Sequence, residues 1–204
     1  MHQSLLALLS AYLVGSIPTA YLLVRWLKRA DVRTIGSGNV GATNVTRAAG
    51  WGAGALVFLL DAAKGLVAVA IIGRSLAPAI SWWCGVCAVI GHVFPCWLRF
   101  RGGKGFATTL GLLLGAAPAV AAACGLAWAL GYLVTRFSSV GSLVGAAAIP
   151  IAQWLLHAPD AELRVGIALA LLLMVTHRSN ILRLLQGREH RAGSGAAIDN
   201  GRDP

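Results

Sequence analysis

The chain alternates between long apolar runs and short polar segments. The apolar runs cover residues 5–26, 51–73, 79–98, 106–135, 140–156 and 165–175. A helix of about 20 apolar residues can cross the hydrocarbon core of a membrane, and most of these runs approach that length. The pattern therefore predicts an all-α, polytopic integral membrane protein with one membrane-embedded domain over residues 1–190. Residues 191–204, rich in glycine and polar side chains, are predicted to form a disordered tail.

The run 106–135 decides how often the chain crosses the membrane. As one helix it would be about 45 Å long, against a hydrocarbon core of about 30 Å. A single span would also leave Arg136 and the basic C-terminal segment outside. A hairpin of two short helices turning near Pro118 would instead keep every basic cluster in the cytoplasm, as the positive-inside rule favours. We therefore predict seven transmembrane helices rather than six, with the N-terminus outside and the C-terminus cytoplasmic.

Composition and charge support a membrane protein with an anionic ligand. The chain is 57% hydrophobic and 12% charged, with a mean hydropathy of +0.73, which is far from a soluble globular domain. Its net charge of +10 comes mainly from cations in the short polar segments and the tail. No basic helix face is interleaved with aromatic residues, so we expect no nucleic-acid partner. Cys84 and Cys87 have redox-motif spacing but lie inside an apolar run, so we expect no redox or metal chemistry.

The segment 91–107 carries the first candidate chemistry. It places Arg99, Arg101 and Lys104 between two apolar runs, and glycines flank Lys104 on both sides. Glycine amides without side-chain cover, at the start of a helix, favour a bound phosphate or carboxylate. We therefore predict that Gly102, Gly103 and Gly105 present free N–H groups to an anion beside Lys104. The alternative is a basic loop that only sets the orientation in the membrane.

The segment 31–47 carries the second candidate for ligand binding. Residues 36–41 have the letters G-x-G-x-x-G, but no strand precedes them and no acidic residue follows at the dinucleotide spacing, so we reject a nucleotide-binding fold. What remains is a glycine-rich loop leading to Arg47, which predicts anion binding. The alternative is an ordinary turn with helix caps. The hydrogen-bonding residues of this loop are Ser37, Asn39, Thr43 and Asn44.

Charged and polar residues also occur within or beside the other spans. Asp61 and Lys64 are three residues apart in the second span, so we expect a structural ion pair on one helix face. The last apolar run ends at His177 and Asn180, and we expect its helix to continue past the membrane. A histidine and an asparagine at a membrane edge favour a functional role over a merely satisfied polar residue.

These polar segments are strong in anion recognition and poor in nucleophiles. The sequence contains no nucleophile elbow and no H-x-x-x-x-D, and Gly105 stands where a P-loop needs serine or threonine after Lys104. Chemistry at such a site would work by positioning and charge stabilisation. The expected reactants are an anionic soluble molecule and a lipid-borne one.

Three segments together resemble the signature segments of a known family. They are Gly36–Asn44 with Arg47, Gly91–Pro95 with Arg101–Gly105, and Thr176–Asn180 with Glu189. In this order, over nearly the whole chain, they are similar to those of the bacterial acyl-phosphate glycerol-3-phosphate acyltransferases, the PlsY family. The resemblance implies acyl transfer from acyl phosphate to glycerol-3-phosphate, giving lysophosphatidic acid, at the cytoplasmic side of the bacterial inner membrane. It implies no cofactor, and an acyl-phosphate-forming enzyme as a possible partner.

The resemblance also implies roles for residues. Arg47 and Lys104 would hold phosphate groups, Ser37 and Ser142 would donate hydrogen bonds, and His177 with Asn180 would orient glycerol-3-phosphate. Either His177 or a substrate phosphate could accept the hydroxyl proton, and we favour the phosphate. The predicted catalytic residues are Lys104, His177 and Arg47; the predicted substrate-binding residues are Ser37, Asn39, Asn44, Gly102, Gly103, Ser142 and Asn180; no metal ligand is predicted.

Two other classes of protein compete with an enzyme. A transporter or channel for an anionic metabolite would place polar groups near the bilayer midplane. Here the polar residues gather at one edge, and only Asp61 and Lys64 lie deep in a span. A purely structural membrane protein would explain neither the glycines beside Lys104 nor the pairing of His177 with Asn180.

Overall fold

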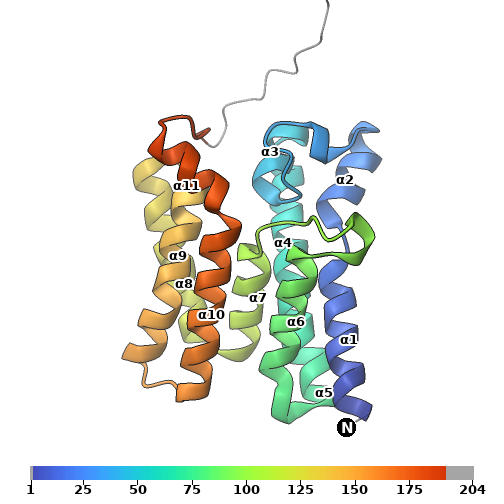
Figure 1. Cartoon of the computed structure of the whole chain (residues 1–204), viewed down its shortest axis with the longest axis vertical. Coiled ribbons are helices and arrows are strands. Elements are labelled where there is room, and N and C mark those ends of the chain that lie inside the picture. Colours follow the sequence, from blue (N-terminus) through green and yellow to red (C-terminus); the bar gives the residue numbers. More distant parts are fainter. Residues whose placement is uncertain (1, 192–204) are drawn as a thin grey trace, which may run out of the picture.

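The protein is a bundle of roughly parallel helices (Figure 1). The computed structural model describes residues 2–191, and within that range no strand forms, which confirms the all-α prediction. The expected tail over 191–204 lies outside the described residues except for Arg191. Five helical segments are long and apolar enough to cross a membrane, and a bent pair of helices would make a sixth. The protein is therefore a multi-span membrane protein, while the count of seven and the orientation stay predictions.

The N-terminal part contains the first three candidate spans. The first runs through α1 (His2–Ser16) and α2 (Thr19–Lys28), which are separated at Ile17 and Pro18. A loop with one short 3-10 turn leads to α3 (Ala42–Ala49), an amphipathic helix outside the spans. The second span is α4 (Trp51–Val67), continued by a π-helical turn, Ala68–Gly73, and α5 (Arg74–Leu76). The third contains α6 (Ser81–Val93).

The long run 106–135 is two helices, as predicted. α7 (Phe106–Ala116) ends at Ala117, whose non-helical backbone (φ −146°, ψ 75°) breaks the helix, and Pro118 begins α8 (Pro118–Thr135). Proline is suited to this first position because its missing N–H would have no helical partner there. In Figure 1 the two helices run in opposite directions. With 11 residues, α7 is about 16 Å long, shorter than an ordinary span.

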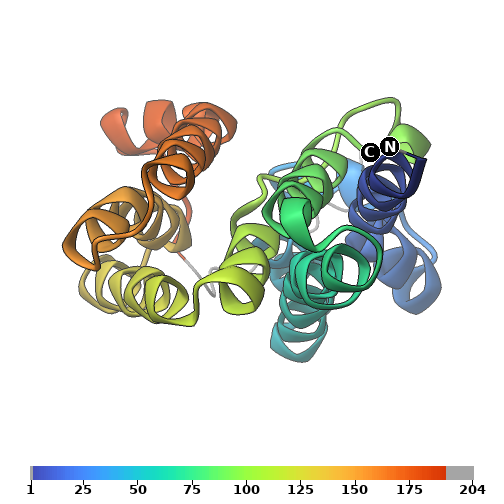
Figure 2. The same cartoon turned by 90° about the horizontal axis from the view of Figure 1, so that it is seen from below.

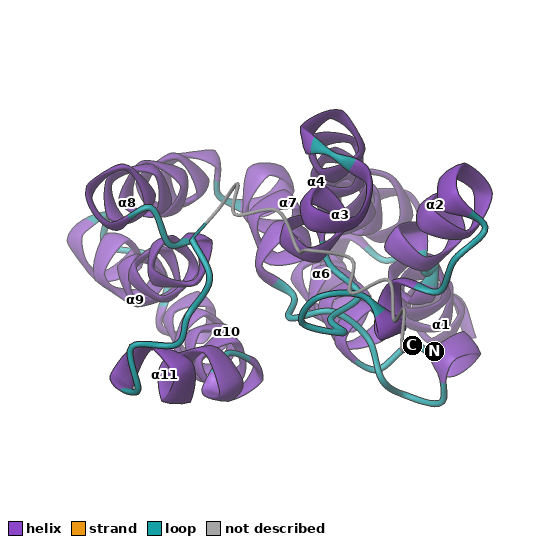
Figure 3. Cartoon of the chain, turned by 90° about the horizontal axis from the view of Figure 1, so that it is seen from above, coloured by secondary structure: helices purple, strands orange, loops and turns teal. Residues whose placement is uncertain are grey.

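The C-terminal part contains α9 (Ser138–Leu155), α10 (Asp160–Thr176) and α11 (Arg178–Leu185). The expectation that the last helix continues past the membrane needs correction, because the chain bends by 56° between α10 and α11. His177 lies at this bend, where its ring Nδ1 is 2.7 Å from the Leu173 carbonyl oxygen. The bend turns α11 across the end of the bundle, which brings residues after it back over α9 (Figure 3).

Seen along the bundle, the helices form two groups (Figure 2). One group contains α1 to α6 and the other α8 to α10, while α7 packs on α4 and α6 and is joined to α8. A buried apolar cluster that includes Val89, Leu112, Ile149 and Leu173 connects the groups. Many large apolar side chains on the outside are exposed, as expected for surfaces that face lipid.

Glycines allow α4 and α7 to pack closely. A Cβ on Gly111 would lie 1.7 Å from the Ala62 carbonyl oxygen, and one on Gly65 would lie 2.0 Å from the Thr108 carbonyl oxygen. Neither position has room for any side chain. Small residues at helix contacts are the usual way for membrane helices to approach, because apolar burial alone gives little attraction between helices in lipid.

Candidate active site

A cavity of about 390 Å³ lies where the polar segments meet. The loop before α3, the residues that lead into α7, the start of α9 and the bend before α11 all border it. Segments more than 100 residues apart in the sequence therefore share one site. The predicted site residues that line it are Ser37, Asn39, Asn44, Arg47, Lys104, Ser142, His177 and Asn180, whereas Gly102 and Gly103 do not.

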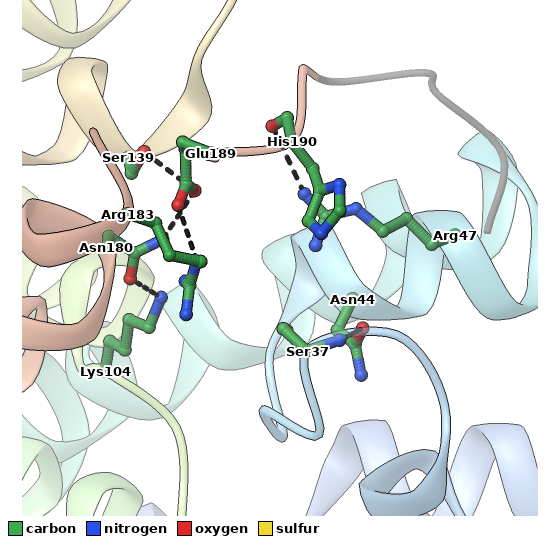
Figure 4. Close-up of polar contacts among 9 residues, drawn as sticks. All are labelled: Ser37, Asn44, Arg47, Lys104, Ser139, Asn180, Arg183, Glu189 and His190. Carbon is green, nitrogen blue, oxygen red and sulfur yellow. Dashed lines mark hydrogen bonds and ion pairs between the residues drawn. The ribbon is translucent and has the colours of Figure 1, made fainter. Parts of the chain in front are cut away.

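Asn44 shapes the glycine-rich loop. Its side-chain amide donates to the carbonyls of Val32 (3.0 Å) and Ile35 (2.9 Å), and its Oδ1 accepts from the Ser37 backbone N–H (3.1 Å). With its amide engaged in this way and 2% of its surface exposed, Asn44 holds the loop in shape. The exposed Ser37 is left beside the cavity, on the loop that Asn44 fixes (Figure 4).

Arg47 brings unmet hydrogen-bond donors to the cavity. Its Nη2 donates to the His190 carbonyl oxygen at 3.4 Å, and its buried Nε has no partner among the described residues. Burial lowers the pKa of this guanidinium, although not enough to discharge it at neutral pH. A guanidinium with free donors in a partly dry site is suited to a phosphate group.

Lys104 is held at both its backbone and its ammonium group. Its carbonyl oxygen accepts a hydrogen bond from Thr176 Oγ1 at 2.8 Å, and its Nζ donates to Asn180 Oδ1. Burial lowers the Lys104 pKa to about 8, with the charge of Arg183 adding to the effect and Glu189 opposing it. The ammonium therefore lies in a place where its charge is costly unless an anion approaches.

The prediction that Gly102 and Gly103 present free amides is wrong. The Gly102 N–H donates to the Val93 carbonyl at 3.0 Å and the Gly103 N–H to the His92 carbonyl at 3.1 Å. Both glycines are required because the loop folds back tightly on the end of α6, a long-range contact that the local sequence does not show. Gly105, at φ 91°, adopts a left-handed conformation at the start of α7.

Glu189 organises the third signature segment. Reasoning from the sequence did not include this carboxylate among the predicted site residues. It accepts hydrogen bonds from Asn180 Nδ2 (2.7 Å), Arg183 Nε (2.8 Å) and Ser139 Oγ (3.1 Å) (Figure 4). Burial alone would raise the pKa of Glu189, but these hydrogen bonds and the charge of Arg183 lower it overall. Because Asn180 donates to Glu189, its Oδ1 is oriented toward Lys104. The only sequence signal for this role is the place of Glu189 in the third signature segment.

His177 and Ser142 are buried beside these groups. The His177 Nδ1 pairs with the Leu173 carbonyl, so Nε2 is the ring nitrogen left for a ligand. Ser142 Oγ donates to the Ser138 carbonyl at 3.0 Å, one turn earlier in α9. Because Ser142 uses its proton within α9, it could donate to a substrate, as predicted, only if this bond were exchanged.

Part of the cavity lining is apolar and aromatic. Trp128 of α8 stacks on Tyr132 at 5.3 Å and lies 6.5 Å from Phe106 and 6.4 Å from Phe58, measured between ring centroids. The aromatic contact between Phe58 and Trp128 joins α4 to α8 across the two helix groups. Anion-binding side chains and an apolar wall thus share one cavity, as a substrate that is part phosphate and part hydrocarbon would need.

Comparison with known proteins identifies the relatives of this chain. The glycerol-3-phosphate acyltransferase family model matches residues 5–187. The glycerol-3-phosphate acyltransferase of Mesorhizobium japonicum is 45% identical over 93% of this chain and 96% of its own, and that of Myxococcus xanthus is 48% identical over 90% and 96%.

Solved structures show the same likeness. A crystal structure of PlsY (YgiH), an integral membrane glycerol 3-phosphate acyltransferase in its glycerol 3-phosphate form, is 39% identical and covers 93% of this chain and 95% of that chain, with a TM-score of 0.87. A lysophosphatidic acid form, 37% identical over 92% of this chain and 94% of that one, has a TM-score of 0.83. This chain therefore belongs to the glycerol-3-phosphate acyltransferase family.

Proposed function

We propose that this protein transfers a fatty acyl group from an acyl phosphate to the sn-1 hydroxyl of glycerol-3-phosphate. The products are lysophosphatidic acid, a phospholipid precursor, and inorganic phosphate. Family membership supports the activity and the acceptor. The observation that carries the proposal is the shared cavity, whose lining contains both the cations Arg47 and Lys104 and the aromatic side chains around Trp128.

Both proposed substrates match the cavity chemically. Each has a phosphate group, and the cavity offers two cationic side chains, Arg47 and Lys104, to bind them. Only the donor has a long hydrocarbon chain, which the aromatic and aliphatic part of the cavity lining would accept. We further propose that the site faces the cytoplasm from the bacterial inner membrane, where an acyl-phosphate-forming enzyme would supply the donor.

The proposed reaction needs positioning more than it needs a strong nucleophile. The glycerol hydroxyl attacks the acyl carbonyl carbon, a new ester bond forms, and the bond between the carbonyl carbon and the phosphate oxygen breaks. Negative charge then gathers on the leaving phosphate, and a preorganised cation such as Lys104 stabilises it there. The hydroxyl proton passes to a phosphate oxygen, because an acyl phosphate is already activated and demands little of a base.

His177 has a supporting part in this scheme. With its Nδ1–H on the Leu173 carbonyl, the ring would donate to the phosphate of glycerol-3-phosphate through Nε2–H in its imidazolium form, while Asn180 aligns Lys104. The rival scheme uses Nε2 as the base that removes the hydroxyl proton. The two schemes differ in whether loss of His177 weakens substrate binding or slows turnover at saturation.

The activity test uses the purified full chain in lipid nanodiscs. Synthetic acyl phosphate and glycerol-3-phosphate should give lysophosphatidic acid and one equivalent of phosphate, whereas acyl-CoA should not replace the donor. Product formation from acyl-CoA at an equal rate would overturn the proposed donor. Uptake of glycerol-3-phosphate into proteoliposomes without any acylated product would indicate a transporter instead.

A further inference from the structure

A buried cluster of charged and polar groups lies between α2, α4 and α6. Asp61 Oδ1 is 2.5 Å from Lys64 Nζ, accepts a 2.6 Å hydrogen bond from Thr19 Oγ1 and lies 3.5 Å from His92 Nδ1. Lys64 Nζ also donates to the Ile17 carbonyl at 2.6 Å, at the break between α1 and α2. This confirms the predicted ion pair between Asp61 and Lys64, but a structural pair does not require the histidine.

The cluster reaches the loop that carries Lys104 through His92. The His92 carbonyl accepts the Gly103 N–H, and a Cβ on Gly103 would lie 2.1 Å from His92 Nε2. The ring therefore lies directly against Gly103, the residue before Lys104. His92 and Asp61 also border the cavity. The Nδ1 of the His92 ring thus faces Asp61, and its Nε2 lies against the loop between α6 and α7.

Lys104 is consequently fixed from two sides. On the α10 side Thr176 Oγ1 holds its carbonyl oxygen, and on the α6 side the His92 ring and carbonyl hold the residue before it. We propose that His92, held by Asp61, is a positioning residue of the acyl transfer, which supports Gly103 and thereby fixes where the Lys104 ammonium lies in the cavity.

The physical reason is the sensitivity of catalysis to small displacements. A shift of about 1 Å in a catalytic group can cost on the order of 100-fold in rate. Lysine has four rotatable side-chain bonds, so its ammonium is well placed only if its backbone is. A ring that is 7% exposed and lies 3.5 Å from a buried carboxylate is a stiff support for that backbone.

The inference rests on the proposed function, and its test is a double-mutant cycle between His92 and Lys104. His92→Phe keeps a ring against Gly103 but removes the nitrogen that faces Asp61. We expect kcat/KM to fall about 10- to 100-fold, as for a misplaced catalytic group. In a Lys104→Met background the same substitution should lower the residual kcat/KM by less than about twofold, because the effect passes through Lys104.

Two further variants separate positioning from general stability. His92→Asn places an amide nitrogen near the position of Nδ1 and should recover part of the lost activity. Gln153→Met is the matched control: it removes a part-buried 3.0 Å hydrogen bond to the Glu162 carbonyl, between two residues outside the cavity lining, and should leave kcat/KM within about twofold. Thermal unfolding of every variant is measured in the same nanodiscs.

If His92→Phe does not fold, the cycle uses Asp61→Leu combined with Lys64→Met. Replacing both charges together avoids leaving one of them buried alone, and His92 then loses its partner. The inference is overturned if either change lowers kcat/KM by the same factor with and without Lys104. Failure of the proposed function is distinguishable, because the unaltered protein would then form no lysophosphatidic acid at all.

Discussion

At the scale of single residues, the charge of Lys104 can be tested most directly. Lys104→Met keeps the length and apolar stem of the side chain but removes the ammonium that Asn180 orients. We expect turnover to fall about 100- to 1,000-fold, the usual cost of losing one transition-state stabiliser. Arg101→Met removes a cation from the same loop at an exposed position outside the cavity lining, and should turn over normally. Equal loss of turnover in both variants would mean that Lys104 serves only as a positive charge that sets the orientation of the protein in the membrane.

The lowered Lys104 pKa predicts a pH dependence. Lysine is cationic below its pKa, so a pKa of about 8 means that the free enzyme loses this charge as the pH rises through 8. We expect kcat/KM to fall tenfold per pH unit above that point. The corresponding fall of kcat should occur at higher pH, because a bound phosphate raises the lysine pKa. Lys104→Arg should abolish the fall in kcat/KM above pH 8, even if its overall activity is low, since arginine stays charged.

His177 separates the two proton-transfer schemes. If it positions glycerol-3-phosphate, His177→Asn should raise the KM for that substrate and recover much of the turnover at saturation. The asparagine amide can still reach the Leu173 carbonyl but leaves no group at the Nε2 position. A kcat lower by about 1,000-fold at unchanged KM, with loss of the acid limb of the pH profile, would identify His177 as the base.

The sequence was informative about residues that act through their own chemistry. Arg47, Lys104, His177 and Asn180 were predicted from charge and position, and the structure brings them to one cavity. Glu189 was missed because a carboxylate near the end of a helical segment has many ordinary explanations. The amides of Gly102 and Gly103 were misjudged, since their partners lie on α6, and local sequence gives no sign of such a contact.

At the scale of helices, the contact between α4 and α7 has no room for added volume. Gly111→Ala would put a methyl group 1.7 Å from the Ala62 carbonyl oxygen, so the two backbones must separate. We expect destabilisation of about 1–3 kcal/mol, as for overpacking, together with lower activity because α7 begins beside Lys104. Thermal unfolding in nanodiscs measures the first effect and the acyl-transfer assay the second.

Gly125→Ala in α8 is the control for that prediction. A Cβ there has no neighbour within 4 Å, and alanine favours a helix over glycine by about 1 kcal/mol, so this variant should be unchanged or slightly more stable. Equal destabilisation by both changes would contradict the packing argument. Gly111 and Gly125 look alike in the sequence, each within an apolar run, and only the three-dimensional contact distinguishes them.

Helix boundaries themselves followed closely from the apolar pattern. The break near Pro118 was predicted from the length of the apolar run and the placement of the basic clusters, and proline suits it because it cannot donate a backbone hydrogen bond in a helix interior. The bend at His177 was not predicted, because no proline or glycine marks it. It coincides with the side-chain hydrogen bonds of Thr176 and His177, which depend on Lys104 and on the preceding turn of α10.

At the scale of the whole molecule, the predicted orientation follows from where the basic segments lie. Arg33, Arg101, Arg136 and Arg183 belong to four different polar segments, and with seven spans all of them face the cytoplasm. Arg136 is decisive, because a helix pair α7 and α8 that together made only one crossing would put it outside. The structure gives this pair a turn at Ala117 and Pro118 with both outer ends directed the same way (Figure 1).

Single cysteines test this orientation in cells. In a background lacking Cys84, Cys87, Cys96 and Cys124, cysteine at position 101 or 136 should react with a membrane-impermeant maleimide only after the cells are opened. Cysteine at the exposed Asp160, at the opposite end of the bundle, should react in intact cells. Labelling of position 136 but not 101 from outside would restore six spans. Labelling of both, with position 160 protected, would invert the protein and move the anion-binding end of the cavity away from a cytoplasmic supply of glycerol-3-phosphate.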